Sequence, residues 1–210
     1  MKALSAFFPR ILPYLPGCPE PLVAQVLIDA AIEFCDSSLV LRQNLDTFNT
    51  VVGRVQYDLD APSAQHDINR VMGVTLDGKE LVAGMAEALR GDMPTAPAKP
   101  RGFYTDRTDS VFTLMLSPPP DEVYSVLVNV ALSPARTATQ LDDDLYNTWI
   151  NPIVSSAIAR AMQIPGQPFS NPAQAQILLN SVARQTVTSR IEGNYGLVRG
   201  SMRVRYRPFA

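Results

Sequence analysis

Hydrophobic and polar positions follow two different periods along this chain, one helical and one extended. Over residues 19–42 the apolar side chains recur every three or four positions, a pattern typical of an amphipathic helix with one buried face. Pro21 suits the first turn of that helix, where a missing N–H is not needed. The predicted buried face comprises Val23, Val26, Leu27, Ala30, Ala31 and Phe34. This helix must find its packing partners far along the chain, because the residues that follow it have the pattern of strands.

Residues 45–139 form the extended region, in which apolar and polar residues alternate. The clearest turn signal is Asp77-Gly78, because this pair tolerates the positive φ angles of a tight hairpin turn. The strongest strand pattern covers residues 123–132 and is preceded by a second one over 111–116. We predict that these two segments form a hairpin with one well-buried face.

From Leu141 onward the period becomes helical again. An apolar stripe covers residues 145–162 but contains Pro152, so either the helix kinks there or a new helix begins with Asn151 as its cap. A last helix is predicted over residues 172–190. Its expected buried residues are Ala175, Leu178, Leu179, Val182 and Ala183.

These patterns predict an α+β fold built as a single domain over residues 1–210. Residues 1–43 and 141–195 are expected to form an antiparallel helical bundle of the N-terminal helix and two C-terminal helices. A β-rich insertion is expected over residues 44–140, and an extended C-terminal arm over residues 196–210.

Composition narrows the class of protein. The chain has 210 residues, of which 46% are hydrophobic and 18% charged, as expected for a folded globular protein. A net charge of −2 argues against general nucleic-acid binding by the whole surface. No apolar run approaches the roughly 20 residues that span a bilayer, so no membrane partner is predicted. Cys18 and Cys35 are predicted to be free thiols, because a helix starting at residue 21 places Cys35 about 21 Å along its axis.

Candidate catalytic chemistry is sparse. The only histidine, His66, lies in a polar stretch with aspartates nearby, and a solvated turn is favoured there over a metal or acid–base site. The consecutive Asp142, Asp143 and Asp144 are interpreted as the start of a helix, where carboxylates cap free N–H groups. Phosphate-binding loops, nucleophile elbows and zinc motifs are absent from the sequence. We therefore assign no catalytic, cofactor-binding or metal-binding residue.

The C-terminal arm has a distinctive chemistry. It carries four arginines and no acidic residue, and apolar residues alternate with several of the arginines, as in an edge strand with one basic face. It either completes the sheet of its own subunit, or docks on a neighbouring chain by strand addition, or neutralises nucleic-acid phosphates. We favour partner docking. The candidate partner-binding residues are Arg199, Met202, Arg203, Val204, Arg205, Tyr206, Arg207 and Phe209.

Taken together, these segments resemble the head-to-tail adaptor, or connector, proteins of tailed bacteriophages, including the tail tubular protein A type. The resemblance is carried by the succession of LPGCPEPLVAQVLIDAAIEFCDSSLV, VVGRVQYDLDAP, VTLDGKEL, LMLSPPPDEVYSVLVNVALSP and LDDDLYNTWINPIVSSAIARAMQIPGQPFSNP. These stretches cover most of the chain in the order of the family.

The resemblance implies a structural protein of the virion that is not an enzyme and needs no cofactor. It would be assembled in the host cytoplasm and located at the head–tail junction. Its partners would be further copies of itself in a ring, expected to be a dodecamer, the portal protein and a tail or nozzle protein. The ring would enclose a channel through which genomic DNA passes without sequence-specific binding. The alternative hypothesis is an enzyme with a site in the β-rich insertion near His66.

Overall fold

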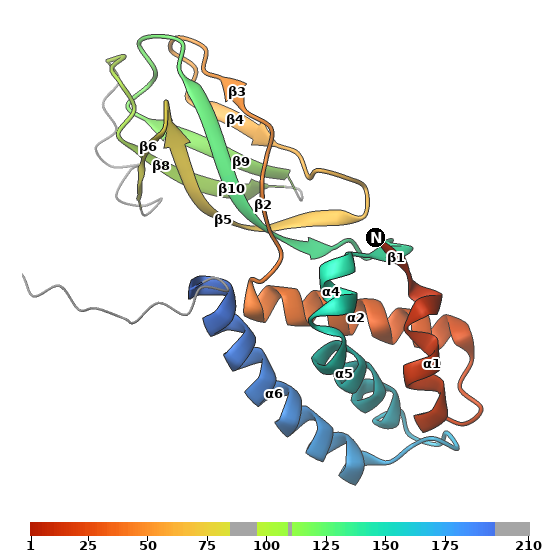
Figure 1. The fold of residues 1–210 in the computed structure, drawn as a ribbon. Helices are drawn as coiled ribbons and strands as arrows, with labels where there is room; N and C mark the ends of the chain where they lie inside the picture. Colours follow the sequence, from red (N-terminus) through yellow and green to blue (C-terminus); the bar gives the residue numbers. More distant parts are fainter. Residues whose placement is uncertain (85–95, 109–110, 196–210) are drawn as a thin grey trace, which may run out of the picture.

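The computed structural model describes residues 1–84, 96–108 and 111–195, which form a helical part and a β part placed end to end (Figure 1). The chain enters the β part after its long N-terminal helix and returns to the helical part after the last long strand of the β part, residues 125–134. Both ends of the described chain therefore belong to the helical part.

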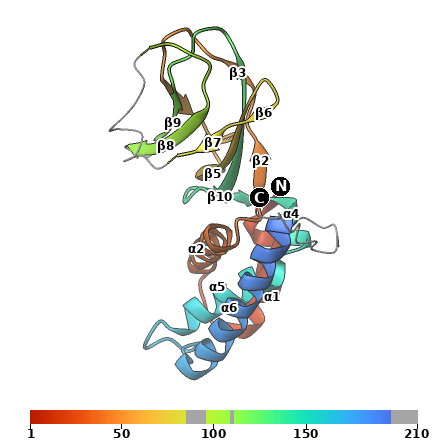
Figure 2. The same ribbon diagram turned by 90° about the vertical axis from the view of Figure 1, so that its left-hand side faces the viewer.

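The helical part contains one long helix from the N-terminal region and three helices from the C-terminal region. Its α-helices are α1 (Phe8–Ile11), α2 (Glu20–Ser38), α4 (Asp143–Asn147), α5 (Ile150–Met162) and α6 (Pro172–Tyr195), with short 3-10 turns at Leu4–Ala6 and Leu12–Tyr14. In Figure 2, α2 lies on one side of this part and α5 and α6 on the other. The core between them contains the predicted apolar face of α2, including Val23, Leu27 and Ala31.

The predicted N-terminal helix is confirmed, and α2 ends where the backbone turns left-handed. Pro19 precedes it in an extended conformation and Pro21 occupies the first turn. Leu39 has φ 53°, and its N–H donates to the carbonyl of Cys35 at 2.9 Å, which closes the last turn.

Chain direction changes at Trp149, between α4 and α5. The conformation of Trp149 is not helical, and Pro152 is the third residue of α5, where its missing N–H breaks no helical hydrogen bond. A new helix therefore begins here, which confirms one of the two predicted alternatives. Its cap is Trp149, so the prediction of Asn151 as the cap is wrong.

The β part is built from two sheets. One has the strand order β2-β10-β5-β6, with β3 also paired to β10, and the other has the order β4-β9-β8-β7. The strands are β2 (Arg42–Asn44), β3 (Phe48–Asn49), β4 (Gln56–Leu59), β5 (His66–Leu76), β6 (Lys79–Glu80), β7 (Val82–Ala83), β8 (Gly102–Thr108), β9 (Val111–Ser117) and β10 (Ser125–Pro134). A further short pair, β1 (Lys2–Ala3) with β11 (Gln140–Leu141), lies beside the helical part.

The two sheets pack face to face around an apolar core of their own. Val126, Val128 and Val130 of β10 are completely buried, and they share this core with Leu114 and Leu116 of β9 in the other sheet. The alternation predicted for residues 123–132 is therefore confirmed. Its partner is different, because β10 pairs with β5 and β9 pairs with β8 and β4.

The Asp77-Gly78 turn is confirmed. Both residues have positive φ angles, 49° and 76°, and the flanking residues Leu76 and Lys79 pair across the hairpin. The Asp77 carboxylate also accepts a hydrogen bond from the N–H of Ser125 at 2.9 Å, which ties the turn to β10.

The predicted fold class, a helical bundle with a β-rich insertion and a C-terminal arm, is wrong. The chain is 39% helix and 28% strand, and its strands form several sheets. Strand pairing over long sequence distances gives the β part a separate apolar core, so it is a second structural layer and not an appendage of a bundle. Leu41 lies between the layers and packs against both cores.

Candidate functional site

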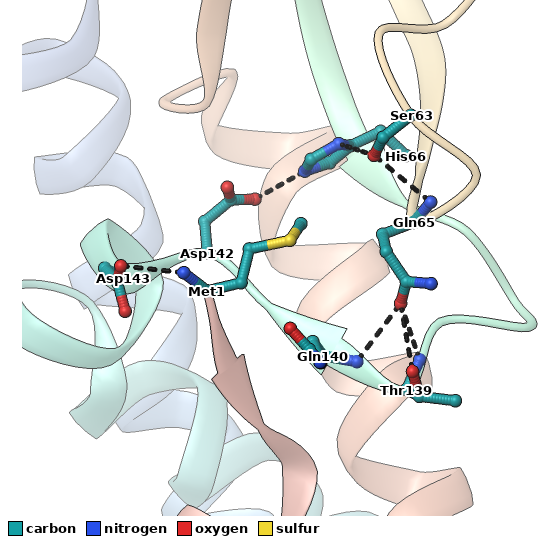
Figure 3. Close-up of polar contacts among 8 residues, drawn as sticks. All are labelled: Met1, Ser63, Gln65, His66, Thr139, Gln140, Asp142 and Asp143. Atoms are coloured by element: carbon teal, nitrogen blue, oxygen red, sulfur yellow. Dashed lines mark hydrogen bonds and ion pairs between the residues drawn. The ribbon is translucent and has the colours of Figure 1, made fainter.

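Polar side chains gather where the helical part meets the β part, and His66 is at their centre (Figure 3). Its ring Nε2 lies 2.7 Å from Asp142 Oδ2, and its ring Nδ1 lies 2.9 Å from Ser63 Oγ. A carboxylate only accepts hydrogen bonds, so Nε2 carries the donated proton and, in the neutral ring, Nδ1 accepts from the Ser63 hydroxyl. Both ring nitrogens are therefore used.

Neighbouring contacts extend this junction. The side-chain carbonyl of Gln65 accepts hydrogen bonds from the N–H groups of Thr139 and Gln140, at 2.8 and 3.2 Å. The amino group of Met1 donates to Asp143 Oδ2 at 2.7 Å and lowers the pKa of that carboxyl (Figure 3). The contacts connect the segment before β5 and the N-terminus to the segment that leads into α4.

The sequence interpretation of this region was partly wrong. His66 was expected in a solvated turn, but it is the first residue of β5 and its side chain is only 8% exposed. Asp142 does take the position before the first turn of α4, yet its carboxylate makes no capping hydrogen bond and contacts His66 instead. No local pattern could have revealed this pair, because 76 positions separate the two residues.

The arrangement serves to hold the helical part against the β part. A serine, a histidine and a carboxylate in series also occur in nucleophilic sites, but such sites need N–H groups directed at a developing oxyanion. Here the nearby N–H of Gln65 donates to Ser63 Oγ itself, at 3.3 Å. Among the described residues, no three His, Cys, Asp or Glu side chains are grouped so that they could hold a metal ion.

Cys18 and Cys35 are both free, as predicted, and both are buried. Burial raises the pKa of the Cys35 thiol, and the carboxylates of Asp36 and Asp142 raise that pKa further. A thiol with a raised pKa stays protonated and is a poor nucleophile at neutral pH.

The outer side of α6 forms a second candidate site, for a protein partner. Ile177, Val187 and Ile191 are 64%, 61% and 52% exposed, and at 100° per residue they lie on one side of the helix. We call these three residues the α6 crest. It lies off the face that the sequence pattern had identified as buried.

The inner face of α6 packs only loosely. Ala175 is buried as predicted, but Leu178, Leu179 and Val182 are half-buried and Ala183 is exposed. A groove of about 250 Å³ separates α6 from α2, and another of about 510 Å³ lies between the start of α6, α5 and the α1 region. The helix therefore stands out from the helical part as a ridge.

The predicted partner-binding arm, residues 196–210, lies outside the described residues, so its contacts stay a prediction. No helix in the described ranges combines the length and apolar character needed to cross a bilayer.

Comparison with known proteins adds the final observation. None of the curated proteins matches the chain. A family model described as SU10 adaptor protein matches residues 6–204, which cover both the helical and the β part. The chain therefore belongs to the SU10 adaptor protein family, a family of phage head–tail adaptors.

Proposed function

We propose that copies of this chain assemble into a ring that encloses a DNA channel and joins the portal to the tail. Family membership supports the coarser role, that of a structural component of the virion that contacts other head and tail proteins. The chain acts as one domain, without catalysis or cofactor, at the head–tail junction after assembly in the host cytoplasm.

The observation that carries the ring is the α6 crest. Ile177, Val187 and Ile191 face solvent in the single subunit, while the opposite side of the same helix faces the core. Large apolar side chains that are exposed on the side of a helix facing away from the core mark a candidate surface for a protein partner. From Ile177 to Ile191 the crest extends about 21 Å at 1.5 Å per residue, long enough for a helix-sized contact with a second subunit.

A closed ring follows if the crest of one subunit contacts a different surface of the next. Such head-to-tail contacts generate rings when the rotation closes. A second surface is available in the groove of about 510 Å³ beside Pro13, Tyr14 and Ile158, because this groove is partly apolar and Tyr14 is 62% exposed. We propose twelve copies, the number that the resemblance to phage connectors implies.

The remaining partners are the portal protein and a tail or nozzle protein. The C-terminal arm, with Arg199, Arg203, Arg205 and Arg207 in its sequence, is the proposed docking segment. The net charge of −2 favours a channel through which DNA passes without tight binding.

The experiment is to purify the full chain and its cognate portal and to measure mass by light scattering, alone and mixed, with negative-stain imaging of the mixture. We expect a ring-shaped particle that co-purifies with the portal. Subunits that remain monomeric at all concentrations and never bind the portal would overturn the proposal.

A further inference from the structure

A groove of about 450 Å³ opens on the β part where the end strands of its two sheets meet. In the described chain β2 ends one sheet path and β4 ends the other. Leu45, Phe48 and Leu59 supply an apolar lining. Because both strands have an outer edge here, the groove offers backbone groups as well as apolar surface to an added strand.

Three carboxylates surround this apolar lining. They belong to Asp46, Asp58 and Asp60, all of which are exposed. Asp58 accepts a hydrogen bond from Thr113 Oγ1 at 3.3 Å. Within the described ranges neither Asp46 nor Asp60 has an ion-pair partner. An extended segment with apolar residues and positive charges would therefore match the groove in shape and in charge.

The chain itself contains such a segment, and it starts nearby. A Cβ at Gly193 of α6 would lie 3.3 Å from Val40 Cγ1, so α6 ends beside the residues that lead into β2. Six residues lead from Val40 to Asp46, about 20 Å of chain when extended at roughly 3.3 Å per residue, and six residues also lead from Tyr195 to Ser201. A segment that ran beside residues 40–46 would therefore bring Arg199 and Arg203 to either side of Asp46.

We propose that residues 199–207 of the same chain occupy this groove in the free subunit and leave it for a partner during assembly. The proposal rests on the proposed function in one respect, that the arm is the partner-binding segment. Tethering favours the intramolecular contact, because a short covalent linker gives an effective concentration in the millimolar range. The groove then keeps a basic, apolar segment covered until a partner competes for it.

The test is disulfide trapping in the full-length chain. Thr47→Cys, next to Asp46 on the groove, is combined with Ser201→Cys in the arm, so that no charge is removed. The matched control combines Ser201→Cys with Val123→Cys, an uncharged position that is 65% exposed in the segment before β10. The native Cys18 and Cys35 are buried and provide a low background. Products are separated by mass under non-reducing conditions, at low protein concentration and without portal.

We expect an intramolecular disulfide that forms at least about tenfold faster for the groove pair than for the control pair. Adding Asp46→Asn and Asp60→Asn, or raising the salt concentration, should slow the groove pair, because screening weakens contacts between exposed charges. Equal rates for the two pairs would overturn the proposal, and so would a product that is mainly a cross-linked dimer. The assay contains no portal and needs no ring, so its failure leaves the portal-binding test of the proposed function unaffected.

Discussion

Asp142 and His66 are 76 positions apart in the sequence, and their Oδ2 and Nε2 atoms lie 2.7 Å apart. Asp142 immediately precedes α4, and His66 begins β5. This contact therefore links a helix in one layer to a strand in the other.

Replacing Asp142 should destabilise the subunit. Asp142→Ala leaves the largely buried ring of His66 without its acceptor, and we expect the free energy of unfolding to fall by about 1–3 kcal/mol. Denaturant titration measures this change. Asp144→Ala is the matched control, since Asp144 is an exposed carboxylate in the same helical turn. Equal losses for the two variants would show that the contact with His66 contributes nothing.

Stability should fall at alkaline pH through Cys35. The ordinary pKa of the thiol is 9.0 and burial raises it in the folded chain, so above pH 9 only the unfolded chain releases this proton. The stabilisation is complete below pH 9 and is lost as pH rises, by about 1 kcal/mol at pH 10.

Cys35→Ala should remove this part of the pH dependence. Denaturant titrations at pH 8 and pH 10 give the difference in unfolding free energy between the native chain and the variant. This difference should be about 1 kcal/mol smaller at pH 10 than at pH 8. Leu27→Ala changes the core of the same helix and removes no titratable group. Its difference in unfolding free energy from the native chain should be the same at both pH values. A constant difference for Cys35→Ala as well would contradict the prediction.

The α6 crest should be needed for assembly and not for folding. Val187→Asp places a charge in the proposed subunit contact, so we expect loss of the ring in sedimentation velocity, with a change of under about 1 kcal/mol in the free energy of unfolding. Val82→Asp is the control, because Val82 is a valine of β7 that is 72% exposed. If both variants assemble normally, the crest is not the contact.

Deleting residues 201–210 should leave the fold intact and impair docking on the portal. Both apolar cores already contain many fully buried side chains from the described residues, so we expect circular dichroism and the free energy of unfolding to change little. Portal binding in a pull-down should be lost. An unfolded product would mean that the arm completes a strand inside its own subunit.

Local patterns in the sequence predicted those features that depend on neighbouring residues. The apolar period located α2, and the Asp77-Gly78 pair located a turn that needs two positive φ angles. The succession of such patterns also supported the resemblance to phage adaptors, which is confirmed.

Features that depend on distant residues were not predictable in this way. β10 pairs with β5, β2 and β3, and nothing in the alternation of β10 specifies those partners or the existence of two facing sheets. The role of His66 was missed for the same reason. On α6, the sequence places Ile177 and Val187 outside the predicted buried stripe. These apolar residues could have indicated the crest, but the fold prediction did not use them.

Two separate apolar cores predict that the subunit can open locally in two different places. The side chains of one core lie in the helical part and those of the other between the sheets, with Leu41 in contact with both. Local opening of one core leaves most apolar contacts of the other in place, so amide hydrogen exchange in β10 and in α5 reports two different opening free energies. An adaptor built in this way can adjust one of its parts while it finds its neighbours and keep the other folded.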